Sequence, residues 1–394
     1  MTAQGDDGAP QNLRGVEDKI VIAPDKFKGS LTATEAARAI ERGVLKARPQ
    51  ARCEICPMAD GGEGTVDAFL ERGAERKVAR VHGPRGALLD AVYARDGETA
   101  ILEMSSASGL GLLDRSQYDP TQTSTFGTGE LIRAALDGGA RRIVMGIGGS
   151  ATNDAGTGML RALGVRFLDA SGAEIDGSIL ELARLESIEL DGLDPRIGET
   201  TIEVAVDVDN PLCGPDGATH TFSTQKGATP EQIEQLESVL RHIAEISART
   251  LGRDESDAAG AGAAGGLGFA LVAFLGAKLL PGVRLIAREC GLDKLLDGAT
   301  LCLTGEGKID LQTLHGKTVY GVAQIAREHH VPTIAFGGTV AQDAKERLAQ
   351  IGIEVVGISP AGMPLEESIR SAAGLLEAAA QAAVSTASGA GMQT

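Results

Sequence analysis

The two ends of the chain share one pattern, in which short apolar runs alternate with amphipathic helical stretches. This alternation restricts the fold more than any other feature of the sequence. Near the start, the strand-like run KIVIAPD (19–25) precedes a helical pattern over 32–49 and a second strand-like run at 51–58. Thr32 and Glu35 have the spacing of a capping box, which predicts the start of the helix. Strands that alternate with helices predict a parallel sheet with right-handed crossovers.

The last part of the chain repeats this alternation of strand-like runs and helical patterns, and the first part continues it. A further helical pattern lies at 62–73 and a third strand-like run at 76–83. Toward the end, strand-like runs at 299–305, 332–338 and 353–359 alternate with helical patterns at 316–330 and 341–352, before a long Ala-rich helix from about Leu365. Both ends therefore read as parts of one layered α/β structure.

The middle of the chain differs in style. Two strand-like runs flank RDGE (95–98), which is a hairpin signal, and glycine clusters become dense, as in GIGGS (146–150) and GAGAAGGLG (260–268). We expect two α/β domains. The first is a discontinuous, parallel-sheet, Rossmann- or flavodoxin-like domain built from 19–83 plus 289–386, and the second is inserted at 84–288. Residues 1–18 and 387–394 lack apolar periodicity and are expected to be loose tails.

Composition and charge exclude several classes of protein. Lys plus Arg number 37 against 54 Asp plus Glu, a net charge of -17, so nucleic acid and anionic membrane surfaces would be repelled. No apolar run is long enough to span a bilayer, and 268–283, the best candidate, carries Lys278 and Pro281. The five cysteines are scattered and no signal-peptide pattern opens the chain, so a reducing cytoplasm is the expected setting. The sequence leaves open whether the protein forms a homo-oligomer.

The glycine cluster GIGGSATNDAG (146–156) follows a strand-like run and precedes a helical one, so its N–H groups are placed to bind an anion. Its start matches G-x-G-x-x-A, and Asp169 ends the next strand-like run, which suits a nicotinamide-dependent dehydrogenase. The following hydroxyl, amide and carboxylate groups instead suit phosphate with a metal ion. A polar loop capped at Thr152 or Asn153 is the third interpretation.

Four short stretches each follow a predicted strand and combine acids with glycine or lysine. Their candidate residues are Asp25, Lys26 and Lys28; Asp60 and Glu63; Asp207, Asp209 and Asn210; and Glu306, Lys308 and Asp310. Taken singly, each stretch is more typical of a turn. Because ligands bind at the carboxyl ends of strands in open α/β sheets, four such stretches together predict one crevice for a cation and a phosphate.

Other known motifs do not fit, because residues that they require are missing or are placed differently. HGKT (315–318) ends like a Walker A loop, but Leu311 stands where that motif needs glycine. Ser150 lacks the G-x-S-x-G context of a nucleophile elbow, and the six histidines form no metal pattern. Cys53 and Cys56 lie three apart on a predicted strand and face opposite sides, so we interpret both as packing residues.

Assembled in order, these motifs resemble the bacterial glycerate kinase family whose usual product is 2-phosphoglycerate. The matching blocks are IAPDKFKGSLTATEAARAI, PMADGGEGT, GTGELI, GIGGSATNDAGTGMLRALG, DVDNPLCG, QKGA, GAAGGLG and TGEGKIDLQTLHGKT. The resemblance covers roughly Ile20 to Pro360. It implies ATP-dependent, Mg²⁺-requiring phosphorylation of D-glycerate in a cleft between two α/β domains. One departure is Ala155, where the family commonly has glycine.

Phosphoryl transfer needs cations at the phosphates, a hydroxyl held in line and an acceptor for its proton. We expect the 148–154 loop to bind the ATP phosphates, with Lys317 nearby, and Lys26 or Lys28 to neutralise charge. Asp207 is the expected base or metal ligand, Asp60 the second choice, and Asn210 a further metal ligand. The loop residues are Gly148, Gly149, Ser150, Thr152, Asn153 and Asp154. The expected substrate shell is Asp25, Lys26, Glu63, Glu306 and Asp310.

Overall fold

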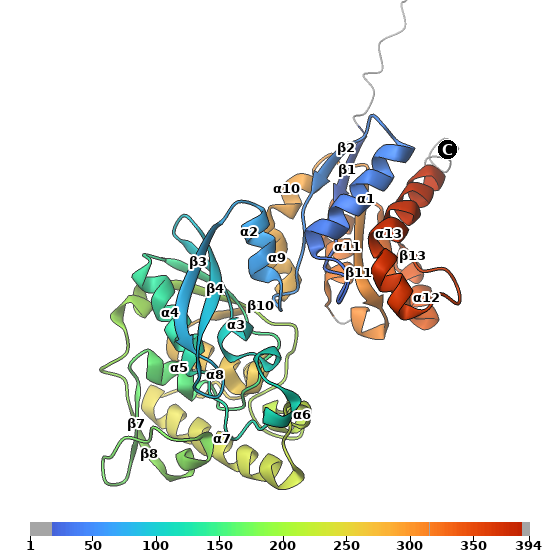
Figure 1. Cartoon of the computed structure of the whole chain (residues 1–394). Helices are drawn as coiled ribbons and strands as arrows, with labels where there is room; N and C mark the ends of the chain where they lie inside the picture. The colour runs from blue at the N-terminus through green and yellow to red at the C-terminus, as the bar shows by residue number, and fades with distance from the viewer. Residues whose placement is uncertain (1–17, 315, 388–394) are drawn as a thin grey trace, which may run out of the picture.

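The chain folds into two α/β lobes, seen in a computed structural model that describes residues 18–314 and 316–387 (Figure 1). Segments from both ends of the chain form one lobe, where the blue helix α1 lies beside the red helix α13 (Figure 1). The middle of the chain forms the other lobe. This arrangement confirms the α/β class and the discontinuous first sheet expected from the sequence.

The first lobe contains five parallel strands in the order β13-β12-β11-β1-β2. The strands are β1 (Lys19–Ile22), β2 (Arg52–Ile55), β11 (Leu301–Ile309), β12 (Thr333–Val340) and β13 (Ile353–Gly357). Its helices are α1 (Ala33–Ala47), α9 (Gly282–Cys290), α10 (Leu292–Leu296), α11 (Thr318–Glu328), α12 (Gln342–Gln350) and α13 (Leu365–Ala387). Apolar residues of α1 and α13 pack on one face of the sheet, and those of α9, α10 and α11 on the other.

Helix α1 begins where the capping-box pattern predicts. The Thr32 side chain accepts a hydrogen bond from the Glu35 N–H at 3.1 Å, and the Glu35 carboxylate accepts one from the Thr32 N–H at 2.9 Å. These bonds satisfy two N–H groups that have no partner within the helix. The helix then buries a stripe of small and apolar residues, including Ile40 and Val44, against the sheet and α13.

The second lobe contains a six-stranded mixed sheet in the order β10-β9-β6-β5-β4-β3. The strands are β3 (Glu75–His82), β4 (Leu88–Asp96), β5 (Thr99–Glu103), β6 (Arg142–Gly146), β9 (Thr201–Ala205) and β10 (Lys278–Leu280). Strands β5, β6, β9 and β10 are parallel, whereas β4 runs antiparallel to both β3 and β5. The predicted hairpin around RDGE is therefore confirmed.

Helices and a small two-stranded sheet complete this lobe. The helices are α2 (Thr65–Glu71), α3 (Ser105–Ser108), α4 (Phe126–Asp137), α5 (Thr157–Ala162), α6 (Ala218–Phe222), α7 (Pro230–Leu251) and α8 (Ala263–Leu275). The small sheet pairs β7 (Arg166–Asp169) with β8 (Leu185–Glu189). Short 3-10 helices are η1 (Leu110–Leu112), η2 (Arg115–Gln117), η3 (Ile179–Arg184), η4 (Pro195–Glu199), η5 (Thr224–Lys226) and η6 (Leu311–Leu314).

Strand β3 lies in a different sheet from the one its position in the sequence suggests. The run at 76–83 follows two strand-helix pairs and reads as a continuation of the first parallel sheet. In the structure it pairs with β4 as the antiparallel edge of the six-stranded sheet. A connection of only five residues joins β3 to β4, and such a short connection favours antiparallel pairing of the two strands. The domain borders at 83 and 289 stay a prediction.

The two lobes share a hydrophobic core. Val21 and Cys302 of the first sheet belong to the same buried cluster as Ile101 and Val144 of the second sheet. Residues of α2 and α9, such as Phe69 and Ile286, join them, and Figure 1 shows both helices between the lobes. This apolar junction fixes the sheets relative to one another and so positions their edges.

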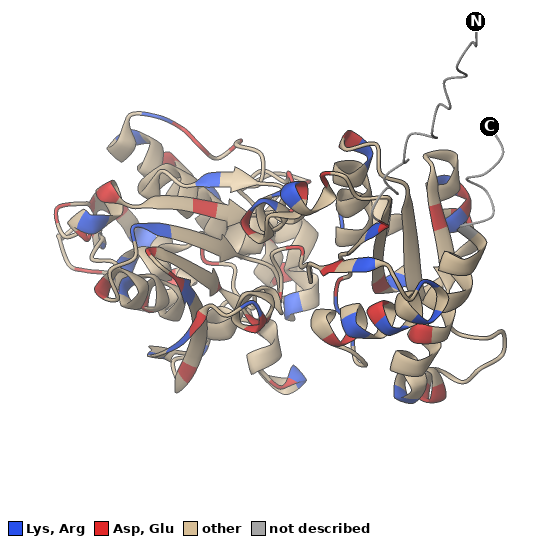
Figure 2. Ribbon diagram, turned by 90° about the horizontal axis from the view of Figure 1, so that it is seen from above, with Lys and Arg blue, Asp and Glu red and all other residues tan. Residues whose placement is uncertain are grey.

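Charged side chains are distributed over both lobes. Figure 2 shows the lysines and arginines of the described residues interspersed with acidic residues on both lobes. Many form ion pairs, such as Arg142 with Glu289 at 2.5 Å and Arg48 with Asp18 at 3.2 Å. Within the described ranges, no helix is long and apolar enough to cross a membrane.

Candidate active site

The loop that follows β2 lies directly on the carboxyl ends of β6 and β9. A Cβ atom on Gly146 would lie 1.9 Å from the Gly61 carbonyl oxygen, and one on Gly61 would lie 2.2 Å from the Ala205 Cβ. On the other side of the loop, a Cβ on Gly282 would lie 2.0 Å from the Asp60 carbonyl oxygen. Glycine at these positions therefore allows the carboxyl ends of the two sheets to meet.

Three carboxylates gather at this meeting point: Asp25 after β1, Asp60 after β2 and Asp207 after β9. Asp207 is exposed as a residue, but nearby protein atoms remove water from its carboxyl group. This desolvation, together with the Asp60 charge, raises the pKa of Asp207 to about 7, although the Gly282 N–H donates to Asp207 Oδ1 at 3.0 Å. Burial and the same Asp60 charge raise the pKa of Asp25 to about 6. The sequence prediction that separate strand ends bring these acids together agrees with this geometry.

Glu306 lies beside this group on β11 and is 8% exposed. Burial raises the pKa of its carboxyl group to about 7, although Thr313 donates a hydrogen bond at 2.6 Å and Lys317 lies near enough to favour the charged form. Thr318 donates to Asp25, so the first turn of α11 also contacts the carboxylate group. Asp310 instead pairs with Lys308 at 2.9 Å, which lowers the pKa of Asp310.

Lysine side chains line the same region but differ in their partners. Lys26 Nζ donates to the Glu63 carbonyl and lies 3.6 Å from the Glu63 carboxylate. It therefore holds the 60–64 loop. Lys28 is exposed on the tight turn between Phe27 and Leu31, and within the described residues the hydrogen bonding of Lys317 is limited to a long 3.5 Å contact with Gln312. Both ammonium groups are thus available to an anionic ligand.

The glycine-rich loop after β6 separates into an exposed part and a buried part. Gly148 and Gly149 are exposed, and Gly148 lies against Gly62. Thr152, Asn153 and Asp154 are 0%, 0% and 3% exposed. The Asn153 amide donates to hydroxyls of α6 and the residue after it, at 3.1 and 2.9 Å. These three side chains therefore organise the loop from beneath, whereas the glycines face solvent.

Asp154 holds the N-termini of two helices together. Its Oδ2 accepts hydrogen bonds from the Thr125 N–H at 2.8 Å and the Thr125 hydroxyl at 2.9 Å, before α4. Its Oδ1 accepts one from the Gly156 N–H at 3.1 Å, before α5. Ala155 adopts φ +48°, and a Cβ on Gly266 would lie 2.8 Å from the Ala155 Cα. Glycine at position 266 therefore allows the two backbones to approach each other closely at Ala155.

Lys226 lies beneath this loop and was not among the residues expected from the sequence. It is 2% exposed, and its Nζ donates to the Thr152 carbonyl at 2.7 Å. Burial lowers the pKa of its ammonium group to about 7, although Asp154 favours the charged form. The Thr152 hydroxyl and the Asn153 side-chain amide oxygen, Oδ1, are buried nearby without a hydrogen-bond partner among the described residues. The loop thus rests on a buried lysine side chain.

The Lys226→Met variant tests this burial through the pH dependence of stability. The unfolded lysine keeps its proton to a pH near 10, whereas the folded one releases it near 7, so unfolding takes up a proton between these values. The wild type should therefore gain stability relative to the variant as pH rises from 7 to 9, by at most about 1.4 kcal/mol per pH unit. Melting curves of both proteins at the two pH values measure this. An unchanged difference in Tm would contradict it.

Comparison with known proteins decides the family. The model of the glycerate kinase family matches residues 20–388. The chain belongs to the glycerate kinase family. It is 46% identical to the glycerate kinase of Bacillus subtilis (strain 168) over 92% of this chain and 96% of the relative. It is 47% identical to the glycerate 2-kinase of Escherichia coli (strain K12) over 86% of this chain and 89% of the relative.

The fold agrees with a solved relative. A crystal structure of a protein assigned as glycerate kinase 2 from Salmonella typhimurium LT2 superimposes with a TM-score of 0.84 at 43% identity, covering 94% of this chain and 98% of that one. This glycerate kinase family member is a phosphotransferase that acts on glycerate, and as a kinase it uses ATP. The family resemblance found in the sequence is therefore confirmed.

The dehydrogenase interpretation is wrong for this glycerate kinase family member. A dinucleotide fold needs its ribose-binding acid at the end of the strand next to the glycine loop, in the same sheet. Asp169 instead ends β7, which pairs with β8 in the separate small sheet. Its carboxylate accepts hydrogen bonds from Ser171 and Ala173 and closes a local turn.

Asn210 lies farther along the loop from Asp207 and has a local role. Its amide group donates to the Asp216 carbonyl at 2.7 Å and so holds the loop that leads into α6. Among residues 18–314 and 316–387, no three Asp, Glu, His or Cys side chains are grouped as a ready-made metal site.

Sequence reasoning missed the groups that support the acids. The Gly282 N–H contacts Asp207 across 75 positions, and Thr318 contacts Asp25 across 293 positions. Glu103, 8% exposed, accepts the Val66 N–H at 2.6 Å and so holds α2 behind the 60–64 loop. The only signal for Lys226 is the short QKGA block of the family resemblance, which carries no chemical pattern of its own.

Proposed function

We propose that this enzyme transfers the γ-phosphoryl group of MgATP to the 2-hydroxyl of D-glycerate, giving 2-phosphoglycerate and ADP. The observation that carries the proposal is the convergence of Asp25, Asp60 and Asp207 where the carboxyl ends of two sheets meet. The relative named glycerate 2-kinase, 47% identical over 342 residues, supports the choice of hydroxyl.

Asp207 is the group that takes the proton of the glycerate hydroxyl. With a pKa of about 7, its carboxylate binds a proton far more readily than an ordinary aspartate while half of it stays ionised at neutral pH. The residue as a whole is exposed, so a small substrate can reach it. Glu306 lies on β11 and Asp310 directly after it, and both orient the remaining hydroxyl of glycerate.

Gly148 and Gly149 present backbone to the phosphates, because they are the exposed part of the glycine loop. Thr152, Asn153 and Asp154 are buried and fix the shape of that loop, so the phosphates meet its exposed glycines. Lys28 and Lys317 neutralise the phosphates and the glycerate carboxylate, since neither ammonium group has a strong partner within the described residues. Such cationic and backbone contacts stabilise the charge spread over the transferring phosphoryl group.

The acidic cluster fits a bound Mg²⁺. Burial and, after it, the Asp60 charge raise the pKa of both Asp25 and Asp207, so negative charge here is poorly compensated by the protein itself. Magnesium is commonly held by one or two carboxylates together with substrate phosphates, so a complete protein cage is not needed. Asp60 and Asp25 would hold the ion, which when bound would neutralise charge on the phosphates.

Initial rates of ADP release test the proposal. The protein is freed of metal with a chelator, then given ATP with D-glycerate or L-glycerate, with and without Mg²⁺. We expect turnover only with D-glycerate and Mg²⁺ together, at least about 100-fold above each other mixture. Equal rates with both enantiomers, or full turnover without a divalent ion, would contradict the proposed substrate or the proposed metal.

A further inference from the structure

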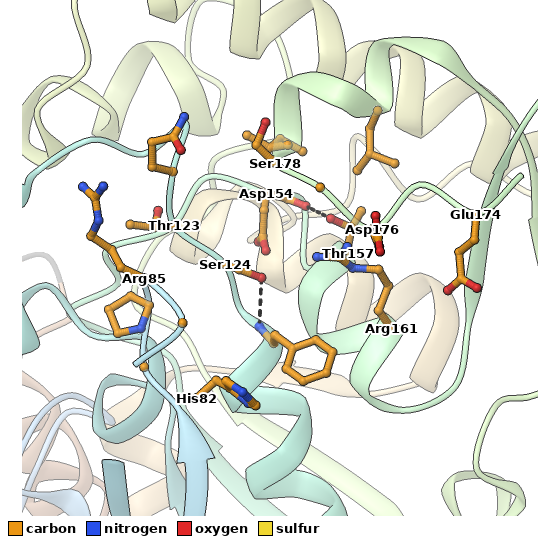
Figure 3. Close-up of a pocket in the computed structure, with 18 residues that line it drawn as sticks. His82, Arg85, Thr123, Ser124, Asp154, Thr157, Arg161, Glu174, Asp176 and Ser178 are labelled. Atoms are coloured by element: carbon orange, nitrogen blue, oxygen red, sulfur yellow. Dashed lines mark hydrogen bonds between the residues drawn. The ribbon is translucent and has the colours of Figure 1, made fainter. Parts of the chain in front are cut away.

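A cavity of about 460 Å³ lies in the inserted lobe, at the carboxyl-end edge of the six-stranded sheet (Figure 3). Its walls come from the turn after β3, the segment before α4, the start of α5 and the region of η3. Strand β3 runs in the same direction as β5, β6 and β9, because β4 is antiparallel to its neighbours. The turn after β3 therefore lies at the same sheet edge as Asp207.

The glycine loop connects this cavity with the acidic cluster. Gly148 at one end of the loop lies against Gly62, beside Asp60. Asp154 at the other end lines the cavity together with Thr157, and Figure 3 shows both side chains in the middle of the view. Four strand spacings, about 19 Å, separate β9 from β3. An extended nucleoside triphosphate covers most of such a span.

We propose that this cavity holds the adenosine part of ATP, while the triphosphate runs along the exposed glycines toward Asp60 and Asp207. The inference rests on the proposed function, since it assigns the remainder of the same substrate. Glycerate has too few atoms to fill a cavity of about 460 Å³, whereas a nucleoside is of the appropriate size. The placement also puts the base away from the site of phosphoryl transfer.

The lining suits a base and a ribose. Phe126 and His82 form an edge-to-face pair with ring centroids 5.5 Å apart, and Ile179 and Leu182 add apolar surface. The Nε atom of Arg161 is buried and has no hydrogen-bond partner among the described residues, so it can donate to a ligand acceptor. Glu174 and Asp176 are exposed acceptors on the same side as Arg161 and are placed to accept from ribose hydroxyls (Figure 3).

A second cavity of about 470 Å³ lies at the amino ends of the strands in the five-stranded sheet of the first lobe. It makes a suitable control because the acids lie at the carboxyl ends of the strands. It is lined by the end of α11 and by the first residues of β12 and β13, including Gln324. These residues stand at the amino ends of parallel strands, whereas the acids stand at the carboxyl ends. A nucleotide bound there could not reach the acidic cluster.

A pair of matched substitutions tests the inference. Gln122 is exposed at the mouth of the first cavity, and Gln122→Trp fills that space; Gln324→Trp makes the same change in the second cavity. We expect Gln122→Trp to raise the KM for ATP about tenfold or more and to leave the KM for D-glycerate within about twofold. Gln324→Trp should leave both constants unchanged. A KM for ATP within about twofold of wild type in Gln122→Trp would overturn the inference.

Photolabelling with 8-azido-ATP gives a readout that needs no turnover. Tryptic peptides 116–133 and 167–184 contain two walls of the cavity, and label should appear in them and disappear when excess ATP is added. ATP-protected label confined to other peptides would overturn the inference. The wild type's phosphorylation of D-glycerate is measured in parallel, so a misplaced nucleoside site is distinguished from an absent kinase activity.

Discussion

Replacement of Asp207 by Asn is expected to lower kcat for glycerate phosphorylation by about 100-fold or more, or at least about 2.7 kcal/mol of transition-state stabilisation. The amide is nearly the same size as the carboxylate and can still accept a hydrogen bond from the Gly282 N–H, so the local backbone keeps its support. What the variant loses is the proton acceptor and one negative charge in a cluster of three.

The control for this variant is Asp191→Asn, an identical change at an exposed position after β8. It should turn over like the wild type. The KM for ATP should stay within about threefold in both variants, because the phosphates are held mainly by backbone and lysines. A loss of less than tenfold in Asp207→Asn would contradict the assignment of Asp207 as the base.

The pH dependence of kcat/KM follows from the same group. Asp207 must be ionised to accept a proton, and its pKa in the free enzyme is about 7. Below that value the ionised fraction falls about tenfold per pH unit, so kcat/KM should fall with it and level off above pH 8. A second titrating acid such as Glu306, also with a pKa of about 7, would steepen this fall.

Gly146→Ala is expected to have the second large effect, although it adds only one methyl group. The new Cβ would lie 1.9 Å from the Gly61 carbonyl oxygen and 2.7 Å from its carbon, so the 60–64 loop would have to move. Because Asp60 begins this loop, its carboxylate would shift relative to Asp207. Displacement of a catalytic group by about 1 Å can cost about 100-fold in rate, and we expect a loss of this size.

Gly198→Ala serves as the matched control, since a Cβ there meets no atom within 4 Å and its backbone is not left-handed. Kinetics and melting curves on both variants separate the effects. For Gly146→Ala we expect the fall in kcat together with a loss of about 1 to 3 kcal/mol in unfolding free energy. Normal kcat in Gly146→Ala would show that the loop does not rest on the β6 end as described.

Much of the site could be predicted from the sequence because strand ends carry a positional rule. Asp25, Asp60 and Asp207 each follow a recognisable apolar run, and parallel strands present their carboxyl ends at one edge. The rule predicts where the backbone of each strand end lies, but not where its side chains point. It could not tell that Asn153 and Asp154 point inward, because the loop there is irregular and includes Ala155 at φ +48°.

The parts of the fold that could not be predicted depend on contacts between distant residues. Strand β3 looks like its neighbours in sequence, and only its pairing with β4 assigns it to the second sheet. Lys226 resembles any lysine of a polar segment until the fold buries it under the Thr152 carbonyl, 74 positions away. Burial of a charged group is a property of the assembled lobe, so no local pattern predicts it.

The ³¹P NMR spectrum of the product tests the central claim most directly. Wild-type protein is incubated with ATP, Mg²⁺ and D-glycerate, and the phosphomonoester that forms is compared with authentic 2- and 3-phosphoglycerate. We predict 2-phosphoglycerate as the single product, formed in amount equal to ADP, and about 1% of that yield or less from Asp207→Asn in the same time. A spectrum of 3-phosphoglycerate, or of inorganic phosphate and ADP alone, would contradict the proposed reaction.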